Sequence, residues 1–75
     1  MLAMAEDVVA EIVATVLEVS AQAGQRVAVG DTLVLLESMK MEIPVLAEDP
    51  GVLAEVTVNP GDVIQAGDVI ARYRD

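Results

Sequence analysis

The chain has 75 residues, and its composition excludes several classes of protein. Acidic residues number 13 against 4 basic ones, and the formal net charge of −9 disfavours binding to nucleic-acid phosphates or anionic lipid headgroups. The longest run without charged or strongly polar residues is Ile12–Leu17, whereas a transmembrane helix needs about 20 apolar residues. Cys and His are both absent, which excludes a disulfide scaffold, a thiol nucleophile, a catalytic triad and a nitrogen- or sulfur-ligated zinc site. We therefore expect a soluble protein without catalytic groups of its own and without nucleic-acid or membrane partners.

The N-terminal region carries conflicting signals. Residues 1–17 contain Ala, Met, Leu and Glu, which favour a helix, but β-branched residues concentrated over residues 8–16 favour strands. We predict a flexible segment over residues 1–7, then a strand over Val8–Val13 within one domain spanning residues 8–75. The segment MLAMAEDVV has no basic region and no long apolar region of a secretory signal, so a cytoplasmic location is expected.

An internal repeat relates the two halves of the chain. A shift of 37 positions places Ala14–Leu36 over Gly51–Tyr73, and both segments read E-V-[S/T] followed by G-x-x-[V/I]-x-x-G-D. Hydrophobic matches are common in a chain with 14 valines, but two glycines at equal spacing and a Gly-Asp pair are not. The pattern indicates a duplicated structural unit.

Each unit is expected to consist of short strands separated by glycine turns. Gly-Asp at residues 30–31 and 67–68 predicts turns, because Gly accepts a positive φ and Asp bonds the following backbone. Strands are then expected over Thr32–Glu37 and Val69–Arg74, where β-branched residues are frequent.

A further strand is predicted over Val52–Val58 from its alternating pattern. Leu53, Glu55 and Thr57 would lie on one face and the intervening residues on the other. Pro44 and Pro60 are expected only at strand ends or edges. Two such units closing on each other predict an all-β fold, a flattened barrel or sandwich with a quasi-two-fold internal repeat, whose closure protects the strand edges.

The junction between the two units reads Glu37-Ser38-Met39-Lys40-Met41-Glu42. Lys40 is the only lysine, and it lies between a strand ending near residue 37 and one predicted over residues 41–46, so we expect it at a hairpin tip. A single surface lysine is usually inert, and methionines usually fill cores. Here, however, Met stands on both sides of the lysine, which offers a modifying enzyme its only side-chain amine.

These residues resemble the signature of the biotinyl domain of biotin-dependent carboxylases, the biotin carboxyl carrier family. That family carries Glu-Ala-Met-Lys-Met around a modified hairpin lysine, and residues 37–41 read Glu-Ser-Met-Lys-Met. The glycine pattern of both halves is also similar, so the resemblance covers residues 8–75. It implies a barrel-sandwich hybrid of two four-stranded antiparallel sheets.

The resemblance also implies the cofactor and the partners. Biotin protein ligase would attach biotin to Lys40, and the domain would carry a carboxyl group from a biotin carboxylase to a carboxyltransferase. The acceptor there would be an acyl-CoA or pyruvate, with an acyl-CoA favoured. Met39 and Met41 would contribute to recognition, while Glu37, Ser38 and Glu42 would form the context of the turn. The chain is expected to be a stand-alone, monomeric carrier that is not an enzyme.

Two departures and three alternatives accompany this interpretation. Ser38 replaces the commoner Ala, and residues 10–15 lack the Pro- and Gly-containing turn that Pro50-Gly51 keeps in the second half. The second departure concerns the first strand and not the lysine.

Lipoyl domains, the first alternative, share the fold but usually place Asp before the lysine and Ala after it. An acidic interaction module with an unmodified lysine is a second alternative, and an enzyme using paired carboxylates is the third.

Overall fold

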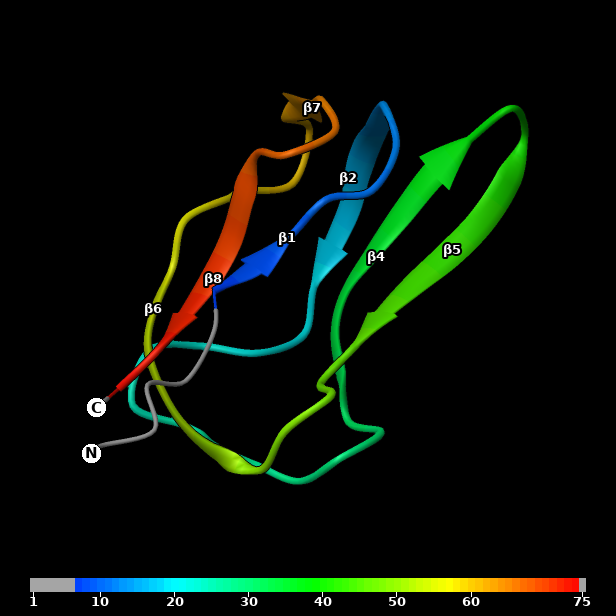
Figure 1. The fold of residues 1–75 in the computed structure, drawn as a ribbon. Helices are drawn as coiled ribbons and strands as arrows, with labels where there is room; N and C mark the ends of the chain where they lie inside the picture. Colours follow the sequence, from blue (N-terminus) through cyan, green and yellow to red (C-terminus); the bar gives the residue numbers. More distant parts are fainter. Residues whose placement is uncertain (1–6, 75) are drawn as a thin grey trace.

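The structure is a computed structural model that describes residues 7–74, and every regular element in it is a strand (Figure 1). The strands are β1 (Val8–Val9), β2 (Ala14–Val19), β3 (Arg26–Val27), β4 (Thr32–Ser38), β5 (Met41–Leu46), β6 (Gly51–Val56), β7 (Val63–Ile64) and β8 (Val69–Tyr73). They form two four-stranded antiparallel sheets, with the orders β1-β8-β6-β3 and β5-β4-β2-β7. The expected all-β architecture is confirmed.

The internal repeat is visible in the strand order. The 37-residue shift exchanges β1 with β5, β2 with β6, β3 with β7 and β4 with β8, which converts one sheet order into the other. Individual hydrogen bonds follow the same rule: Ala10 N–H donates to the Asp68 carbonyl at 2.9 Å, and Ala47 N–H donates to the Asp31 carbonyl at 2.8 Å. The two halves are therefore the same backbone unit built twice.

The glycine turns have the predicted conformation. The φ angles of the four repeat glycines lie between +86° and +94°, a region that residues with a Cβ rarely adopt (Gly24, Gly30, Gly61 and Gly67). The prediction that each aspartate bonds the backbone that follows it is wrong. Each carboxylate accepts a hydrogen bond from the backbone three residues earlier, from Ala28 to Asp31 at 2.9 Å and from Gln65 to Asp68 at 2.8 Å. The aspartates thus close their turns from the C-terminal side.

The core lies between the two sheets and is almost entirely aliphatic. Among residues 7–74 no polar or charged residue is buried apart from Tyr73, whose hydroxyl donates to the Asp49 carbonyl at 2.7 Å. The largest side chains that are fully buried come from both halves: Leu33, Leu36, Leu53, Ile70, Val16, Val27 and Val34. Burial of these side chains supplies the main stabilising contribution, since no disulfide is available.

The first strand is shorter than predicted. β1 covers only Val8–Val9, residues 11–12 form a bend, and β2 begins at Ala14. The reason is tertiary, because β1 pairs with β8 while β2 pairs with β4 and β7. The chain must leave one sheet after two residues in order to enter the other. The predicted flexible segment, residues 1–7, lies outside the described residues except for Asp7.

The alternation predicted for the strand near residue 53 is also wrong. Leu53 is fully buried, but Ala54 and Glu55 are both exposed, because the pairing register of β6 with β8 shifts between Leu53 and Glu55. The equivalent shift occurs in β2 between Val16 and Glu18. A β-bulge adds one residue and reverses the facing of those beyond it, so a strict period of two fails at this point in both halves.

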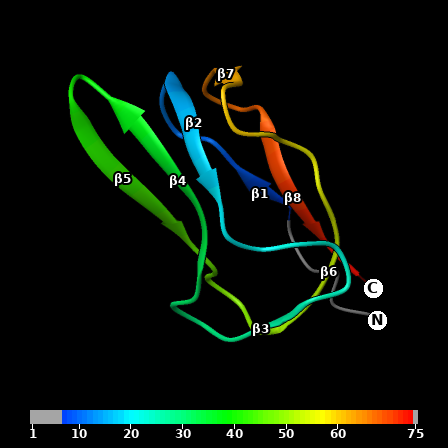
Figure 2. The ribbon, with the colours of Figure 1, turned by 180° about the vertical axis from the view of Figure 1, so that it is seen from behind.

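The molecule is elongated, with principal extents of 41 × 20 × 18 Å. The β4–β5 hairpin projects at one end, and β8 runs towards the opposite end, as seen from both sides in Figures 1 and 2. Pro44 lies within β5, which is an edge strand as expected for a proline, and Pro60 lies outside the strands. No helix among residues 7–74 has the length and apolar character needed to cross a membrane.

Candidate functional site

The β4–β5 hairpin places Lys40 at its tip, as predicted. Ser38 pairs with Met41 across the two strands, so the connection consists of only Met39 and Lys40. Their φ angles are 53° and 64°, and two successive residues with positive φ define the type I′ turn. This turn matches the twist of the flanking strands, which fixes the direction in which the tip projects.

The residues of this turn are not those that the turn itself favours. Type I′ turns select Asn, Asp and Gly, because a side chain with a Cβ is strained at positive φ. Met39 and Lys40 are the only non-glycine residues with positive φ among residues 7–74. Local conformational preference therefore does not explain why Met and Lys stand here.

The methionines are exposed and do not belong to the core. The exposed fraction is 91% for Met39 and 63% for Met41, and Lys40 is exposed between them. This excludes the interpretation of the two methionines as core filler. The tip instead presents one amine between two flexible, polarisable apolar side chains, a surface suited to contact with another protein.

The acidic residues of the motif face each other across the hairpin. Glu37 and Glu42 are directly opposite in the register, and both are exposed. Two like charges in this position destabilise a strand pair. The two ion pairs among residues 7–74 both use Arg72, so Lys40 has no carboxylate partner within the described part of the chain. The amine stands free in solvent.

The hairpin tip provides an exposed amine to which a cofactor can be attached covalently. No group of three acidic residues within the described range could hold a metal ion. An amine at the tip of a rigid hairpin can form an amide with the carboxyl group of a cofactor, and biotin has such a group. Sequence reasoning located Lys40 and its neighbours but missed the positive φ of Met39 and Lys40; the two-residue spacing between the paired strands was the signal for it.

Comparison with known proteins identifies the family. A family model described as "Biotin-requiring enzyme", covering biotin and lipoyl attachment domains, matches residues 3–73. The chain belongs to this family. It is a biotinyl domain, with covalently attached biotin as its cofactor, and it is a carrier without catalytic activity of its own.

Relatives of this biotinyl domain include both single-domain proteins and parts of larger ones. The chain is 66% identical over 68 residues to a "Biotinylated protein TB7.3 homolog" of Mycobacterium leprae, covering 91% of this chain and 96% of that protein. It is 40% identical to a biotin-dependent acyl-coenzyme A carboxylase alpha3 subunit of the same species, covering 89% of this chain and 11% of the subunit.

A solved structure shows that lipoyl domains share the fold. The lipoyl domain of the 2-oxoglutarate dehydrogenase complex from Azotobacter vinelandii superposes with a TM-score of 0.74 and 25% identity, covering 91% of this chain and 96% of that one. The backbone alone therefore does not separate the two cofactors. The relatives reported above are a biotinylated protein and a subunit of a biotin-dependent carboxylase, which supports a biotin carrier.

Proposed function

We propose that Lys40 is the biotin-bearing residue and that biotin protein ligase modifies it. The observation that carries the proposal is the position of the only lysine, exposed at the tip of a two-residue turn and flanked by exposed methionines. A ligase must enclose the acceptor amine, and a projecting turn is the part of this molecule that fits into a concave active site. The proposal also places the domain in the cytoplasm, as a monomer.

The role of Lys40 derives from the chemistry of amide formation. After losing a proton to the ligase, its Nζ attacks the carbonyl carbon of biotinyl-adenylate; the C–N bond forms and the bond to AMP breaks. The ammonium is lost, so the formal charge of the chain changes from −9 to −10. The nucleophile in this step is the neutral amine, so removal of the Nζ proton is a task for the ligase.

The neighbouring residues position and present the amine. Met39 and Met41 offer apolar contacts on either side of Lys40, and their exposure leaves them accessible to a partner. Glu37 and Glu42 place negative charge on the two strands next to the turn, and Ser38 is the last residue of β4 before it. The strained turn restricts the tip to one backbone direction, which reduces the conformational entropy lost on docking.

The partners proposed for the loaded domain are a biotin carboxylase and a carboxyltransferase, with an acyl-CoA as the carboxyl acceptor. Similarity to an acyl-coenzyme A carboxylase subunit supports this acceptor. When attached, biotin supplies a ring nitrogen that carries the carboxyl group between the two active sites. The domain holds the attached biotin away from its own body, because the hairpin projects from one end of a molecule 41 Å long.

Intact-mass measurement of the protein from its own source, combined with fragmentation, tests the modification. The expected result is one biotinyl adduct on Lys40 in the wild type and none in Lys40→Arg, with the same melting temperature for both. A lipoyl mass on Lys40 would assign the domain to the other cofactor. An unmodified lysine in cells with active ligase and ample biotin would refute the proposal.

Rates of ligation and carboxyl transfer test the recognition role. We expect Met39→Ala and Met41→Ala to slow biotinylation or the later carboxyl transfer while the fold remains intact. Val63→Ala is the matched control, because Val63 is 70% exposed but lies in β7, outside the hairpin. Unchanged rates in both methionine variants would remove this role and leave the assignment of Lys40 standing.

A further inference from the structure

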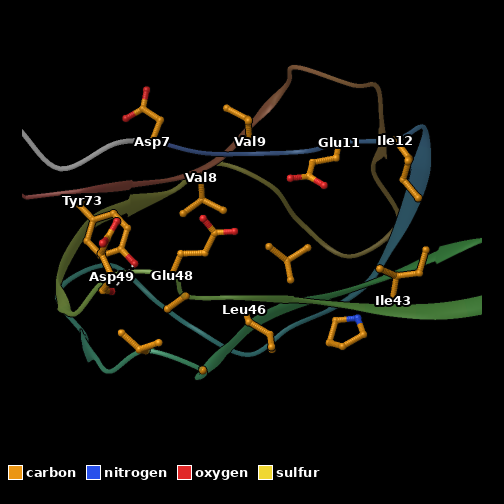
Figure 3. Close-up of a pocket in the computed structure, with 15 residues that line it drawn as sticks. Asp7, Val8, Val9, Glu11, Ile12, Ile43, Leu46, Glu48, Asp49 and Tyr73 are labelled. Carbon is orange, nitrogen blue, oxygen red and sulfur yellow. Dashed lines mark hydrogen bonds between the residues drawn. The ribbon is translucent and has the colours of Figure 1, made fainter.

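A groove of about 830 Å³ lies between β1 and β5, the end strands of the two sheets (Figure 3). One wall is formed by β1 and the bend after it, and the other by β5 and the residues immediately after it. Val8 and Glu11 point from the first wall into the gap, and Glu48 points back from the second. Tyr73 closes one end.

The walls of the groove are equivalent in the internal repeat. The 37-residue shift that relates the two halves superposes Val8 on Val45, Val9 on Leu46 and Glu11 on Glu48. The groove therefore lies where the repeat brings two copies of the same edge together. It is a product of the duplication and not a defect of packing.

The groove lining is mostly apolar and remains open to solvent. Ile12 is 39% exposed and points into the groove, whereas the exposed side chains of Val9 and Leu46 point away from the gap (Figure 3). Ile43 and Val45 are half-buried and connect its floor to the hydrophobic core. Apolar side chains left exposed together in a concave site are a marker of binding.

The charges around the groove all have one sign. Its lining contains four carboxylates and no basic residue (Asp7, Glu11, Glu48 and Asp49). Asp7 is paired with Arg72 at 3.5 Å, and the other three have no ion-pair partner among residues 7–74. A second copy of the chain would bring the same charges and a net charge of −9, so this rim disfavours self-association and favours a basic ligand.

Of the two end strands at the groove, only β5 differs from the other edges of the sheets. β1, β3 and β7 have two residues each, which is a short edge that resists pairing. β5 has six residues and is the only long end strand in the described part of the chain. An extended peptide can pair with such an edge on either side of Pro44, which has no N–H to donate, while alternate side chains enter a neighbouring groove.

We propose that this groove docks an extended segment of a partner protein in which aliphatic and basic side chains alternate. The aliphatic side chains would fill the space between Val8 and Val45, and the basic ones would pair with Glu11, Glu48 and Asp49. The groove begins at Ile43, three residues from Lys40, and extends away from the tip. A docked segment thus leaves the turn uncovered. The domain stays bound to its partner protein while Lys40 remains free to enter the active sites of other proteins.

The test is chemical-shift mapping on the isotope-labelled full chain with two synthetic peptides. The first is acetyl-Lys-Val-Lys-Val-Lys-Val-Lys-amide, and the second replaces each Val by Ser at equal charge. We expect the Val peptide to shift amide signals at residues 8–12 and 43–49, and the Ser peptide to bind at least about tenfold more weakly, because it cannot use the apolar floor. Equal binding of the two peptides, shifts spread over the whole acidic surface, or no shifts at millimolar peptide would overturn the proposal.

A pair of charge variants makes the test specific to the groove. Glu48→Lys should weaken binding of the Val peptide by about threefold or more, because an exposed attraction becomes a repulsion. Glu18→Lys makes the same change of net charge at an exposed residue outside the groove and should have a smaller effect. Equal weakening by both variants would show a bulk charge effect and refute the site. Biotin is not needed in either experiment, so the outcome is independent of the function proposed for Lys40.

Discussion

The two halves of this domain differ mainly in how their equivalent strands are connected. In the first half β4 continues through the two-residue turn Met39-Lys40 directly into β5, whereas β1, the equivalent of β5, is followed by β2 and is not joined to β8 by such a turn. The strands, bulges and glycine turns are duplicated, but the turn with the lysine occurs once. The duplicated parts provide stability, and the unique part carries Lys40, the proposed attachment site.

A second difference lies inside the core, where the two halves solve one packing problem with different residues. Ala14 and Leu36 in the first half correspond to Gly51 and Tyr73 in the second. A Cβ placed on Gly51 would lie 3.0 Å from the Cδ2 atom of Tyr73. The larger Tyr73 side chain therefore requires the smaller residue opposite, and the hydroxyl gains a hydrogen bond to Asp49.

Equivalent truncations of the core should have the largest effect and should be similar in the two halves. Leu33 and Ile70 correspond in the repeat, and both are 0% exposed. Leu33→Ala and Ile70→Ala should each lower the free energy of unfolding by about 2–5 kcal/mol, because each leaves a cavity. Urea denaturation measures both values. A small loss in one half only would show that the two units do not contribute equally.

The pair formed by Gly51 and Tyr73 should be energetically coupled. Gly51→Ala should cost about 1–3 kcal/mol, because the added methyl group meets the Tyr73 ring. In a Tyr73→Leu background, which restores the arrangement of the first half, the same substitution should cost less than about 0.5 kcal/mol. A double-mutant cycle by urea denaturation measures this difference. Equal costs in both backgrounds would contradict the packing explanation.

The glycine turns should respond to substitution equally in the two halves. Gly30 and Gly67 both have φ of +93°, and an added Cβ would meet no atom within 4 Å at either position. Gly30→Ala and Gly67→Ala should therefore each cost about 1–2 kcal/mol, from backbone strain alone. Thermal and urea unfolding of the two variants provide the measurement. Stability equal to the wild type would mean that the turns tolerate a side chain.

The hydroxyl of Tyr73 should give the second half a pH dependence that Leu36 cannot give the first. Burial raises the pKa of Tyr73, an effect that the hydrogen bond to Asp49 partly opposes. Its contribution to stability is complete below the unfolded pKa of about 10 and is lost as the pH rises through the folded value. Tyr73→Phe should cost about 1 kcal/mol at neutral pH and reduce the loss of stability above pH 10. Unfolding curves at several pH values would reveal an unchanged slope if Tyr73 is not responsible.

Much of this molecule could be predicted from its sequence because the determining interactions are local. The paired glycines predicted turns of positive φ, the 37-residue repeat predicted a doubled unit, and the segment between the strands predicted Lys40 at a hairpin tip. These features depend on residues a few positions apart, or on a pattern that the chain itself repeats.

Other features were decided only by the tertiary structure. β1 ends at Val9 because the chain changes sheets there, and Leu53 is buried beside an exposed Glu55 because a bulge shifts the register against β8. The contact of Tyr73 with Asp49 and the groove between β1 and β5 join segments far apart in sequence. Pairing between distant strands sets these positions. No periodicity within a single strand encodes them, because each depends on where the partner strand begins and ends.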